Sequence, residues 1–466
     1  MRTPIFSSLS LLTAVLVGCT NAPPPDEVRA RIAEDLGNVL HEGKAASDGS
    51  TASLPSGTAF GLLTASVDQS GTTARLLAPL REIATTKGVM NADGDSGFDP
   101  DAIIKMLNEE LFTDANYLGG GVYKVPASMV CTETTYDSSG NPVTAINQDC
   151  AHAIDRAQLR VRVEEDDGLR FWVQIDSNHD EPLGFLLRHD ELAVTINLDD
   201  ATDAMIALAQ MFGTQAPNVD LSGQITASVQ IIGEAHAKIA LTFDRALAIK
   251  FADQGVDLNS ADAFRFASAQ ANVFAIELDG HATKGSFDLG LGETTAHVPH
   301  DVDPATDYFL AGATVNATFQ ANTLTLNNIS LGNKTTTVSV GGQQAASVDL
   351  NPNDGRKLSA TVTLDPGTLT ETVTVSPRLE LLASVNHALL GDTQPVYDVT
   401  RVFLDGSLRS TALPDQVEVV SGTYSIATTP AQYGFSATAG QCVLGTDTYD
   451  PVTYDSYTLF SVGACN

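Results

Sequence analysis

Oxygen-bearing side chains recur at short intervals just before residue 100, at Asn91, Asp93, Asp95 and Asp99. Glycines stand among them, so the backbone can make a tight turn that points alternate side chains inward. Carboxylate and amide oxygens around such a turn are the ligands that a hard cation such as Ca²⁺ prefers. A plain acidic, glycine-rich turn is the favoured interpretation, and calcium is the one candidate cofactor of this chain.

The same four residues resemble the start of the calcium loop of EF-hand and dockerin domains. Two positions depart from that loop. Ser96 stands where the loop has a glycine, and Ala102 stands where a bidentate glutamate closes the ligand shell. The resemblance therefore implies an incomplete calcium loop, and both interpretations stay open.

A second group with metal-ligand chemistry contains His297 and His300, followed by Asp301 and Asp303. Pro299 favours an extended backbone, in which residues three apart point to opposite sides. Binding of both imidazoles to one metal would need a turn. We therefore expect an ordinary surface loop here.

Nucleophile and nucleotide motifs are missing in any usable form. The sequence has no Gly-x-Ser-x-Gly, His-Glu-x-x-His, P-loop or Gly-x-Gly-x-x-Gly pattern. Paired carboxylates have no fixed spacing, so an envelope enzyme without a recognisable motif stays an alternative. No catalytic residue can be named.

The N-terminus has the features of an export signal. Arg2 supplies a positive charge, and residues 5–17 form an apolar run that is too short for a permanent membrane-spanning helix. The run ends in Leu16-Val17-Gly18-Cys19, which resembles the lipobox of bacterial lipoproteins. An ordinary secretory signal that ends in cysteine is the alternative.

The lipobox resemblance implies cleavage before Cys19, attachment of a diacylglycerol to its sulfur and acylation of the new amine. Two or three acyl chains such as palmitate anchor a protein stably to a membrane. Thr20 follows where an aspartate would retain the protein at the inner membrane, so the resemblance implies the outer membrane, on its periplasmic face or at the cell surface.

Four cysteines remain beside Cys19, and an even number in an exported chain indicates disulfides. Each neighbouring pair encloses a short segment rich in turn residues. The favoured pairing is therefore local, Cys131 with Cys150 and Cys442 with Cys465, because short loops close at low entropic cost. A metal site is the alternative, although no Cys-x-x-Cys spacing occurs.

The composition restricts the partners of the protein. The 57 acidic residues outnumber the 25 lysines and arginines and give a formal charge of −32, which disfavours nucleic acid and anionic lipid surfaces. A hydrophobic content of 43% suffices for a packed core. We expect membrane contact through the lipid at Cys19 and either a lipid or an envelope protein as partner.

Hydrophobic periodicity predicts an α+β fold that is mainly β, with a helical N-terminal part and a large antiparallel β body, either a sandwich or a half-open barrel. A helix should run from Asp26 to near Gly43, and Pro100 should begin another that extends to Leu111. The predicted regions are 1–18 (signal peptide), 19–57 (tether, helix and linker, the linker from residue 44), 58–120 (helical, with helices at 59–67 and 72–87), 121–380 (antiparallel β, with one helix at 199–212) and 381–466 (C-terminal β with a disulfide).

Several strands can be placed by the alternation of apolar and polar residues, among them 221–231, 235–243, 247–251, 274–278, 315–319, 359–364 and 369–375. One hairpin can also be registered. If Val163 opposes Phe171, both faces are consistent, Arg162 opposes Trp172, and Gly168 takes the left-handed position of the turn. The indole would then lie within reach of the guanidinium.

The leading functional hypothesis is a lipid-anchored envelope lipoprotein with a non-catalytic structural or recognition role. A carrier of lipid or another apolar ligand in a β-sheet groove is the alternative, at the level of fold analogy. The apolar face of the hairpin separates them, since it must meet either ligand or protein, and helices 103–111 and 204–212 are expected to cover much of it. An outer-membrane pore is disfavoured by a single tryptophan and 6% aromatic residues.

Overall fold

The structure is a computed structural model, and it describes residues 22–51, 100–136, 142–175, 182–211, 215–282, 284–300, 304–320, 323–365, 367–390, 397–411, 416–449 and 456–465. Strands contain 59% of the residues and helices 17%, which confirms the predicted fold class, with an N-terminal helix and a large antiparallel sheet body. The chain forms two compact units. Unit 1 is Met1–Asn38 with Pro79–Leu192, and unit 2 is Val39–Ala78 with Ala193–Asn466.

Unit 1 combines short helices with an antiparallel sheet in the order β1-β2-β5-β6-β7. The strands are β1 (Tyr117–Gly119), β2 (Val122–Lys124), β5 (Arg160–Glu165), β6 (Leu169–Gln174) and β7 (Leu183–Arg188). A separate hairpin pairs β3 (Thr132–Tyr136) with β4 (Pro142–Ile146). The helical segments are α1 (Pro25–Arg31), η1 (Ile32–Leu36), α6 (Pro100–Met106), η2 (Leu107–Leu111), α7 (Ala127–Val130) and α8 (Gln148–Ala157).

The β5–β6 hairpin has the predicted register, with Val163 opposite Phe171 and Arg162 opposite Trp172. The turn differs in one detail, because Asp167 has a φ of 54° and Gly168 a φ of 133°. Aspartate tolerates the left-handed region better than most residues do, so the turn needs two unusual positions where the sequence predicted one.

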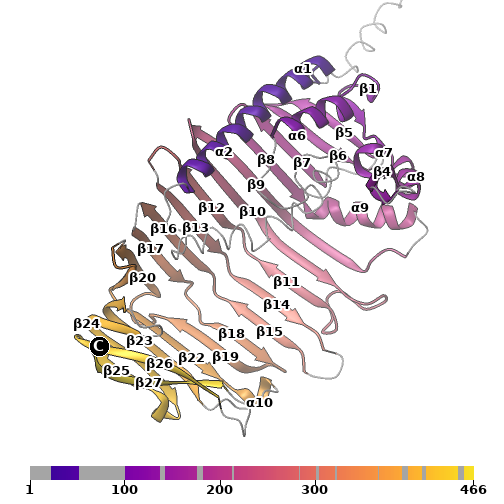
Figure 1. The fold of residues 1–466 in the computed structure, drawn as a ribbon. Coiled ribbons are helices and arrows are strands. Elements are labelled where there is room, and N and C mark those ends of the chain that lie inside the picture. Colours follow the sequence, from indigo (N-terminus) through magenta and orange to yellow (C-terminus); the bar gives the residue numbers. More distant parts are fainter. Residues whose placement is uncertain are drawn as a thin grey trace, which may run out of the picture. The chain divides into compact units, whose positions relative to one another are not determined.

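Unit 2 (Figure 1) contains an antiparallel sheet that begins with the long strands β9 (Val219–Gly233) and β10 (His236–Phe251). From β10 onward each line of the sheet consists of two shorter strands, because β10 pairs with both β11 and β12. Two half-sheets result. They rejoin at β23 (Asp398–Ser410), which pairs with the last strand of each, and β24 (Gln416–Thr429) follows.

The first half-sheet is β12 (Ala271–Asp279), β13 (Lys284–Leu291), β16 (Ala313–Gln320), β17 (Thr323–Leu331), β20 (Lys357–Asp365) and β21 (Thr370–Ser376). The second half-sheet is β11 (Phe264–Ser268), β14 (Thr294–Val298), β15 (Thr306–Leu310), β18 (Thr336–Val340), β19 (Gln343–Leu350) and β22 (Leu379–Val385). The remaining elements of unit 2 are α9 (Leu198–Met211), α10 (His387–Leu390), η3 (Ala431–Tyr433), β25 (Phe435–Thr438), β26 (Gln441–Tyr449) and β27 (Ser456–Ala464). Strand β8 (Glu191–Asn197) crosses the boundary between the units.

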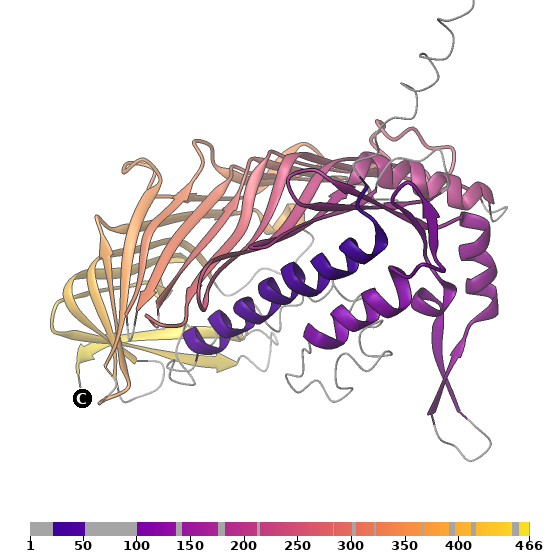
Figure 2. The same ribbon diagram turned by 90° about the horizontal axis from the view of Figure 1, so that it is seen from above.

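Between β10 and β23 the two half-sheets meet along a line where one strand ends and another begins, which we call the fold line. Gly332 lies on it, and its amide donates to the carbonyl oxygen of Gly312 at 3.0 Å. A Cβ at Gly332 would stand 1.7 Å from the carbonyl oxygen of Ala311, so only glycine allows the two backbones this approach. The interruptions let the sheet bend, and Figure 2 shows the strands of unit 2 curving along their length.

Asn351 is the polar centre of the fold line and is fully buried. Its side-chain nitrogen donates to the carbonyl oxygens of Lys357 (2.9 Å) and Arg378 (2.6 Å), and its side-chain oxygen accepts from the amide of Glu380. One side chain thereby supplies partners to backbone groups at two neighbouring interruptions. A buried polar group is tolerated when all its hydrogen bonds are made, as they are here.

The end of the N-terminal helix was predicted wrongly. The helix does not end near Gly43, because α2 (Gly37–Thr51) continues it through residues 44–51, which were predicted to be linker. Ala46 explains the difference. It is fully buried and packs against Ala237, Leu278 and Phe319 of unit 2, so tertiary contact stabilises a segment with weak intrinsic signals.

The predicted strands 235–243 and 247–251 are one strand, β10. The polar residues between them form an irregularity, since the register with β9 shifts between Phe243 and Arg245 and again before Ala248. A bulge keeps the strand continuous while it re-aims the side chains. The helix predicted at 199–212 is present as α9, which packs on β9, where the hydroxyl of Thr202 accepts from the amide of Leu221 at 3.1 Å. The helices predicted at 59–67 and 72–87 lie outside the described residues.

Asp349 makes the stability of the fold line dependent on pH. The Arg356 guanidinium binds its two carboxylate oxygens at 2.8 and 3.0 Å and lowers the pKa of Asp349. A lowered folded-state pKa gives stability that is fully present above the unfolded-chain pKa of about 3.9 and is lost as the pH falls through the folded-state value.

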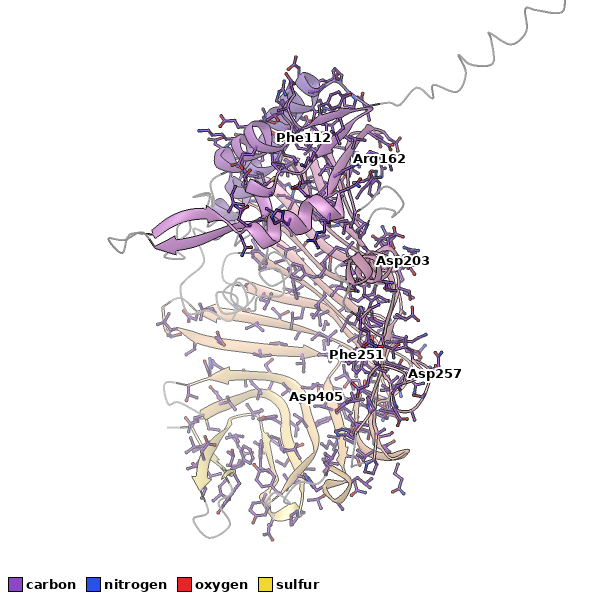
Figure 3. All side chains as sticks on the ribbon, turned by 90° about the vertical axis from the view of Figure 1, so that its right-hand side faces the viewer. Phe112, Arg162, Asp203, Phe251, Asp257 and Asp405 are labelled. Atoms are coloured by element: carbon purple, nitrogen blue, oxygen red, sulfur yellow. A yellow bond between two sulfur atoms is a disulfide. The ribbon has the colours of Figure 1, made fainter. Side chains whose placement is uncertain are left out.

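We therefore predict that Asp349→Asn lowers the free energy of unfolding at pH 7 by about 1.5–3 kcal/mol and costs much less at acid pH, where the wild-type carboxylate is itself protonated. Urea unfolding at a series of pH values measures this. Asp405→Asn is the control, since Asp405 is exposed on β23 (Figure 3). A loss that is independent of pH would contradict the role of the ion pair.

Candidate apolar binding site

One face of the unit 2 sheet is apolar from β9 to β21 and β22. In antiparallel pairs, directly opposed residues share a face, so the register defines rows that run across the strands. One row of the first half-sheet crosses eight strands through Val229, Ile239, Ile276, Phe287, Ala317, Leu326, Ala360 and Val375. The adjacent row on the other face is polar throughout: Gln230, Lys238, Glu277, Ser286, Thr318, Thr325, Thr361 and Thr374.

The second half-sheet repeats this apolar face. Its central row is Leu221, Ile249, Phe266, Ala296, Tyr308, Val338, Ala346 and Val385. We call this row, with its same-face neighbours Phe251 and Val348, the open face. Its largest exposures are Phe251 at 51%, Tyr308 at 46%, Val385 at 40% and Val348 at 38%. No member of the row is buried.

The apolar face of the first half-sheet is covered in part, since Ile239 and Leu289 on it remain 37% and 42% exposed. Ala46 of α2 packs over Ala237, Leu278 and Phe319. Glu42, one turn earlier, accepts from the amide of Ala235 at 2.8 Å in the β9–β10 turn. This helix therefore takes the place of solvent over one end of the apolar face. Farther along, Leu350, Leu358, Ala360, Val375 and Leu404 form a second buried cluster.

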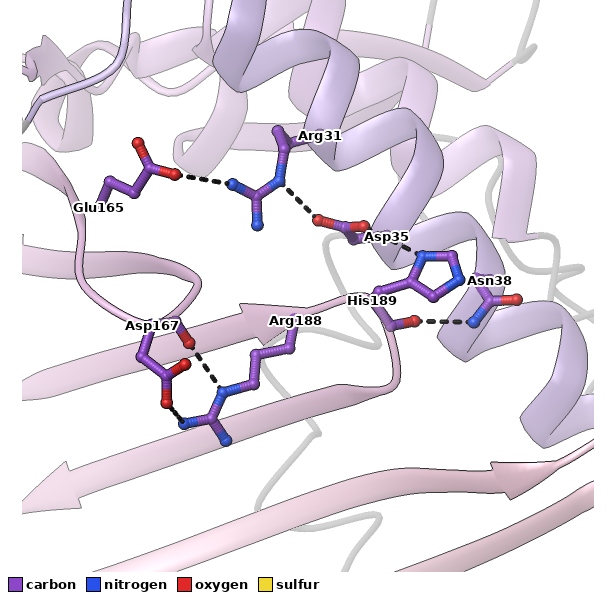
Figure 4. Close-up of polar contacts among 7 residues, drawn as sticks. All are labelled: Arg31, Asp35, Asn38, Glu165, Asp167, Arg188 and His189. Carbon is purple, nitrogen blue, oxygen red and sulfur yellow. Dashed lines mark hydrogen bonds and ion pairs between the residues drawn. The ribbon is translucent and has the colours of Figure 1, made fainter.

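A polar cluster in unit 1 is the other group of converging side chains (Figure 4). Asp35 is 7% exposed at its side chain and lies between Arg31, at 2.8 Å, and His189, at 3.3 Å. Its carboxylate raises the pKa of Arg31. Asn38 donates to the carbonyl oxygen of His189 at 2.7 Å, so the cluster holds the N-terminal helix on the turn after β7. In this cluster the Asp35 carboxylate and the Asn38 amide bind other residues of unit 1, so we do not assign a ligand to it.

The hairpin face in unit 1 is closed by protein. Val163 is fully buried and Phe171 is 8% exposed. Phe112, which follows η2, contacts the rings of Tyr123 and Phe171 at centroid distances of 5.1 and 5.4 Å. The hairpin face is therefore covered next to the expected helix 103–111, by the residue that follows it, while cover by the helix itself stays a prediction. The other expected cover, helix 204–212, is part of α9, which packs on β9. This hairpin offers no groove.

On the hairpin's polar face, Arg162 pairs with Glu164 at 3.2 Å. The Trp172 ring lies against Gly184 on β7, where a Cβ would meet it at 2.3 Å. The stacking of Arg162 on Trp172 stays a prediction.

The predicted site residues fare differently. Cys442 and Cys465 form a disulfide, as predicted. Cys131 is buried and disulfide-bonded, while the side chain of Cys150 is not among those described, so that pairing stays a prediction. The lipid attachment site Cys19 and the calcium residues Asn91, Asp93, Asp95 and Asp99 lie outside the described residues.

His297 is held in the sheet by two acceptors. Its Nδ1 lies 2.7 Å from Asp307, and its Nε2 lies 2.9 Å from the carbonyl oxygen of Ala261. Over the described part of the chain, no group of histidine, cysteine and carboxylate side chains is arranged to hold a metal.

No protein-family model, curated protein or solved structure matches the chain. Within the described ranges, no helix combines the length and the apolarity needed to cross a membrane.

Tyr123 gives a test of the unit 1 core. Burial raises its pKa to about 12, and its hydroxyl has no hydrogen-bond partner among the described residues. We predict that Tyr123→Phe keeps or raises the free energy of unfolding, because it removes an unpaired buried hydroxyl.

Tyr397→Phe is the matched control. Its hydroxyl donates to the carbonyl oxygen of Thr458 at 3.1 Å and accepts from the Thr458 amide at 3.3 Å, so its loss should cost about 0.5–1.5 kcal/mol. Chemical denaturation measures both variants. Equal losses would show that the Tyr123 hydroxyl is bonded.

Proposed function

We propose that this protein is a lipid-anchored lipoprotein of the cell envelope, tethered to the outer membrane through Cys19, and that unit 2 carries an apolar chain such as the acyl chain of a lipid. The single observation that supports the carrier role is the open face. A soluble protein rarely exposes a continuous apolar surface of this extent unless something binds there.

The dimensions of the open face suit a long, thin ligand. Its row crosses eight strands, and strands about 4.8 Å apart give roughly 34 Å of apolar surface in one direction. Each methylene that leaves water on such a surface contributes about 0.8 kcal/mol, so a single acyl chain gains several kcal/mol without any specific polar contact. The face has few polar groups that would need a partner, which favours a hydrocarbon over a peptide.

The anchor and the face support one another. A lipid at Cys19 would keep the protein at the membrane, where acyl chains are found, while the net charge of −32 keeps its surface from adhering to anionic headgroups. Transfer of a chain would then proceed by contact of the open face with its donor.

A structural or recognition role is the second candidate. The closed hairpin face and the fully used polar cluster of unit 1 favour it, because both are packed rather than open. This role predicts no apolar ligand.

Binding of a fluorescent fatty acid to the delipidated mature chain separates the two candidates. We expect saturable binding that Val348→Asp weakens at least about tenfold, because a carboxylate on the open face must lose its hydration when a chain binds. Ser347→Asp is the control, since Ser347 is the preceding residue of β19 and points to the other face. Absence of saturable binding by the wild type would leave the structural role as the better account.

The anchor has its own test. Cells that express the wild type should incorporate radioactive palmitate into the protein, and Cys19→Ser should abolish the label and leave an unprocessed or soluble form. Label that persists in the variant would exclude Cys19 as the attachment site.

A further inference from the structure

The polar face of the second half-sheet carries a row of charges in an unusual order. The register places Asp220, Lys250, Arg265, His297, Asp307 and Ser339 directly opposite one another on six consecutive strands. Side chains at opposed positions have Cβ atoms about 4.5–5.5 Å apart, so each residue lies beside its neighbours in the row. Arg265 therefore stands between a lysine and a histidine.

Like charges at directly opposed positions destabilise a sheet. The neighbours of Arg265 reduce this cost through partners of their own. Lys250 binds Asp220 at 3.0 Å, and His297 lies 2.7 Å from Asp307.

Arg265 has no such partner. Its Nη1 donates to the carbonyl oxygen of Asn259 at 2.9 Å, and no carboxylate of the described residues forms an ion pair with it. A guanidinium that keeps unused donors in a chain with 57 acidic residues is a local conflict of the kind that marks functional sites.

Five residues of the row, all but Asp220, line a depression of ≈ 440 Å³: Lys250, Arg265, His297, Asp307 and Ser339. Thr295 and Thr337 line it as well. Phe309 forms part of the wall, and Lys334, which is paired with Glu293, lies 5.1 Å from the centre of its ring. The depression therefore offers a fork of donors, a second cation and several hydroxyls on one surface.

We infer that this depression is a binding site for a small organic oxyanion, a carboxylate or a phosphate, with Arg265 as its main ligand. A guanidinium matches two oxygens of either group with two parallel hydrogen bonds, which a lysine cannot do. The hydroxyls of Thr337 and Ser339 suit a hydroxylated body such as a sugar or glycerol. The site is on the face opposite to the open face, so it is independent of the proposed carrier role.

Titration of the full mature protein with four probes tests the inference: inorganic phosphate, sn-glycerol 3-phosphate, glucuronate and uncharged glycerol. We expect saturable heat of binding for at least one of the three anions and none for glycerol. Preference for sn-glycerol 3-phosphate would indicate a lipid headgroup as the source, and preference for glucuronate an acidic sugar. Absence of saturable binding by all three anions would overturn the site.

Variants test the role of Arg265. Arg265→Gln should weaken the bound anion at least about tenfold, and Arg265→Lys should lie between it and the wild type, because it keeps the charge and loses the fork. Lys238→Gln, on the polar face of the first half-sheet, should leave binding unchanged. Unchanged binding in Arg265→Gln would overturn the inference.

The melting temperature of Arg265→Gln without ligand distinguishes a binding role of Arg265 from a structural one. Removal of the conflict should leave the unliganded Arg265→Gln protein as stable as the wild type or more stable. The anion should raise the melting temperature of the wild type only. A lower melting temperature without ligand would assign Arg265 a structural role instead.

Discussion

The structure of unit 2 depends on one constraint: a very wide antiparallel sheet has one apolar face that must be withdrawn from water. A flat sheet of this width would leave that face open everywhere. The fold line meets this constraint, because the interruptions between β10 and β23 let the sheet bend. Asn351 stabilises the bend, because its side chain forms hydrogen bonds with backbone groups that the interrupted strands leave without a ladder partner.

The two units satisfy the same constraint to different degrees. In unit 1 the sheet is small, and the ring of Phe112 packs on its hairpin. In unit 2 the helix α2 covers only the part of the first half-sheet around Ala237 and Phe319. The second half-sheet has groups without a partner on both faces. One face has exposed apolar side chains, and the other has the Arg265 guanidinium, which forms no ion pair with a described residue.

The sequence predicts those features that depend on neighbouring residues. The register of the β5–β6 hairpin follows from alternation on both of its faces, and α9 follows from its apolar period and capping aspartates. The extension of the helix beyond Gly43 could not be predicted from the sequence, because the contacts that stabilise it come from strands about two hundred residues away. The charge row around Arg265 was also hidden, since residues 252–263 separate β10 from β11 and the register between them cannot be counted across such a connection. Its one sequence signal was the rarity of basic residues.

The last strand of the chain lies at the end of the sheet. Among the described strands, β27 pairs with β26 alone, and the disulfide between Cys442 and Cys465 joins the two where Cys442 opposes Gly463. An edge strand can slip in register or accept a strand from another molecule. The disulfide forbids slippage by fixing one pair of positions covalently. In an oxidising compartment the disulfide therefore holds β27 in register with β26. In a reducing compartment this constraint is lost, and the edge strand can pair with a strand of another molecule.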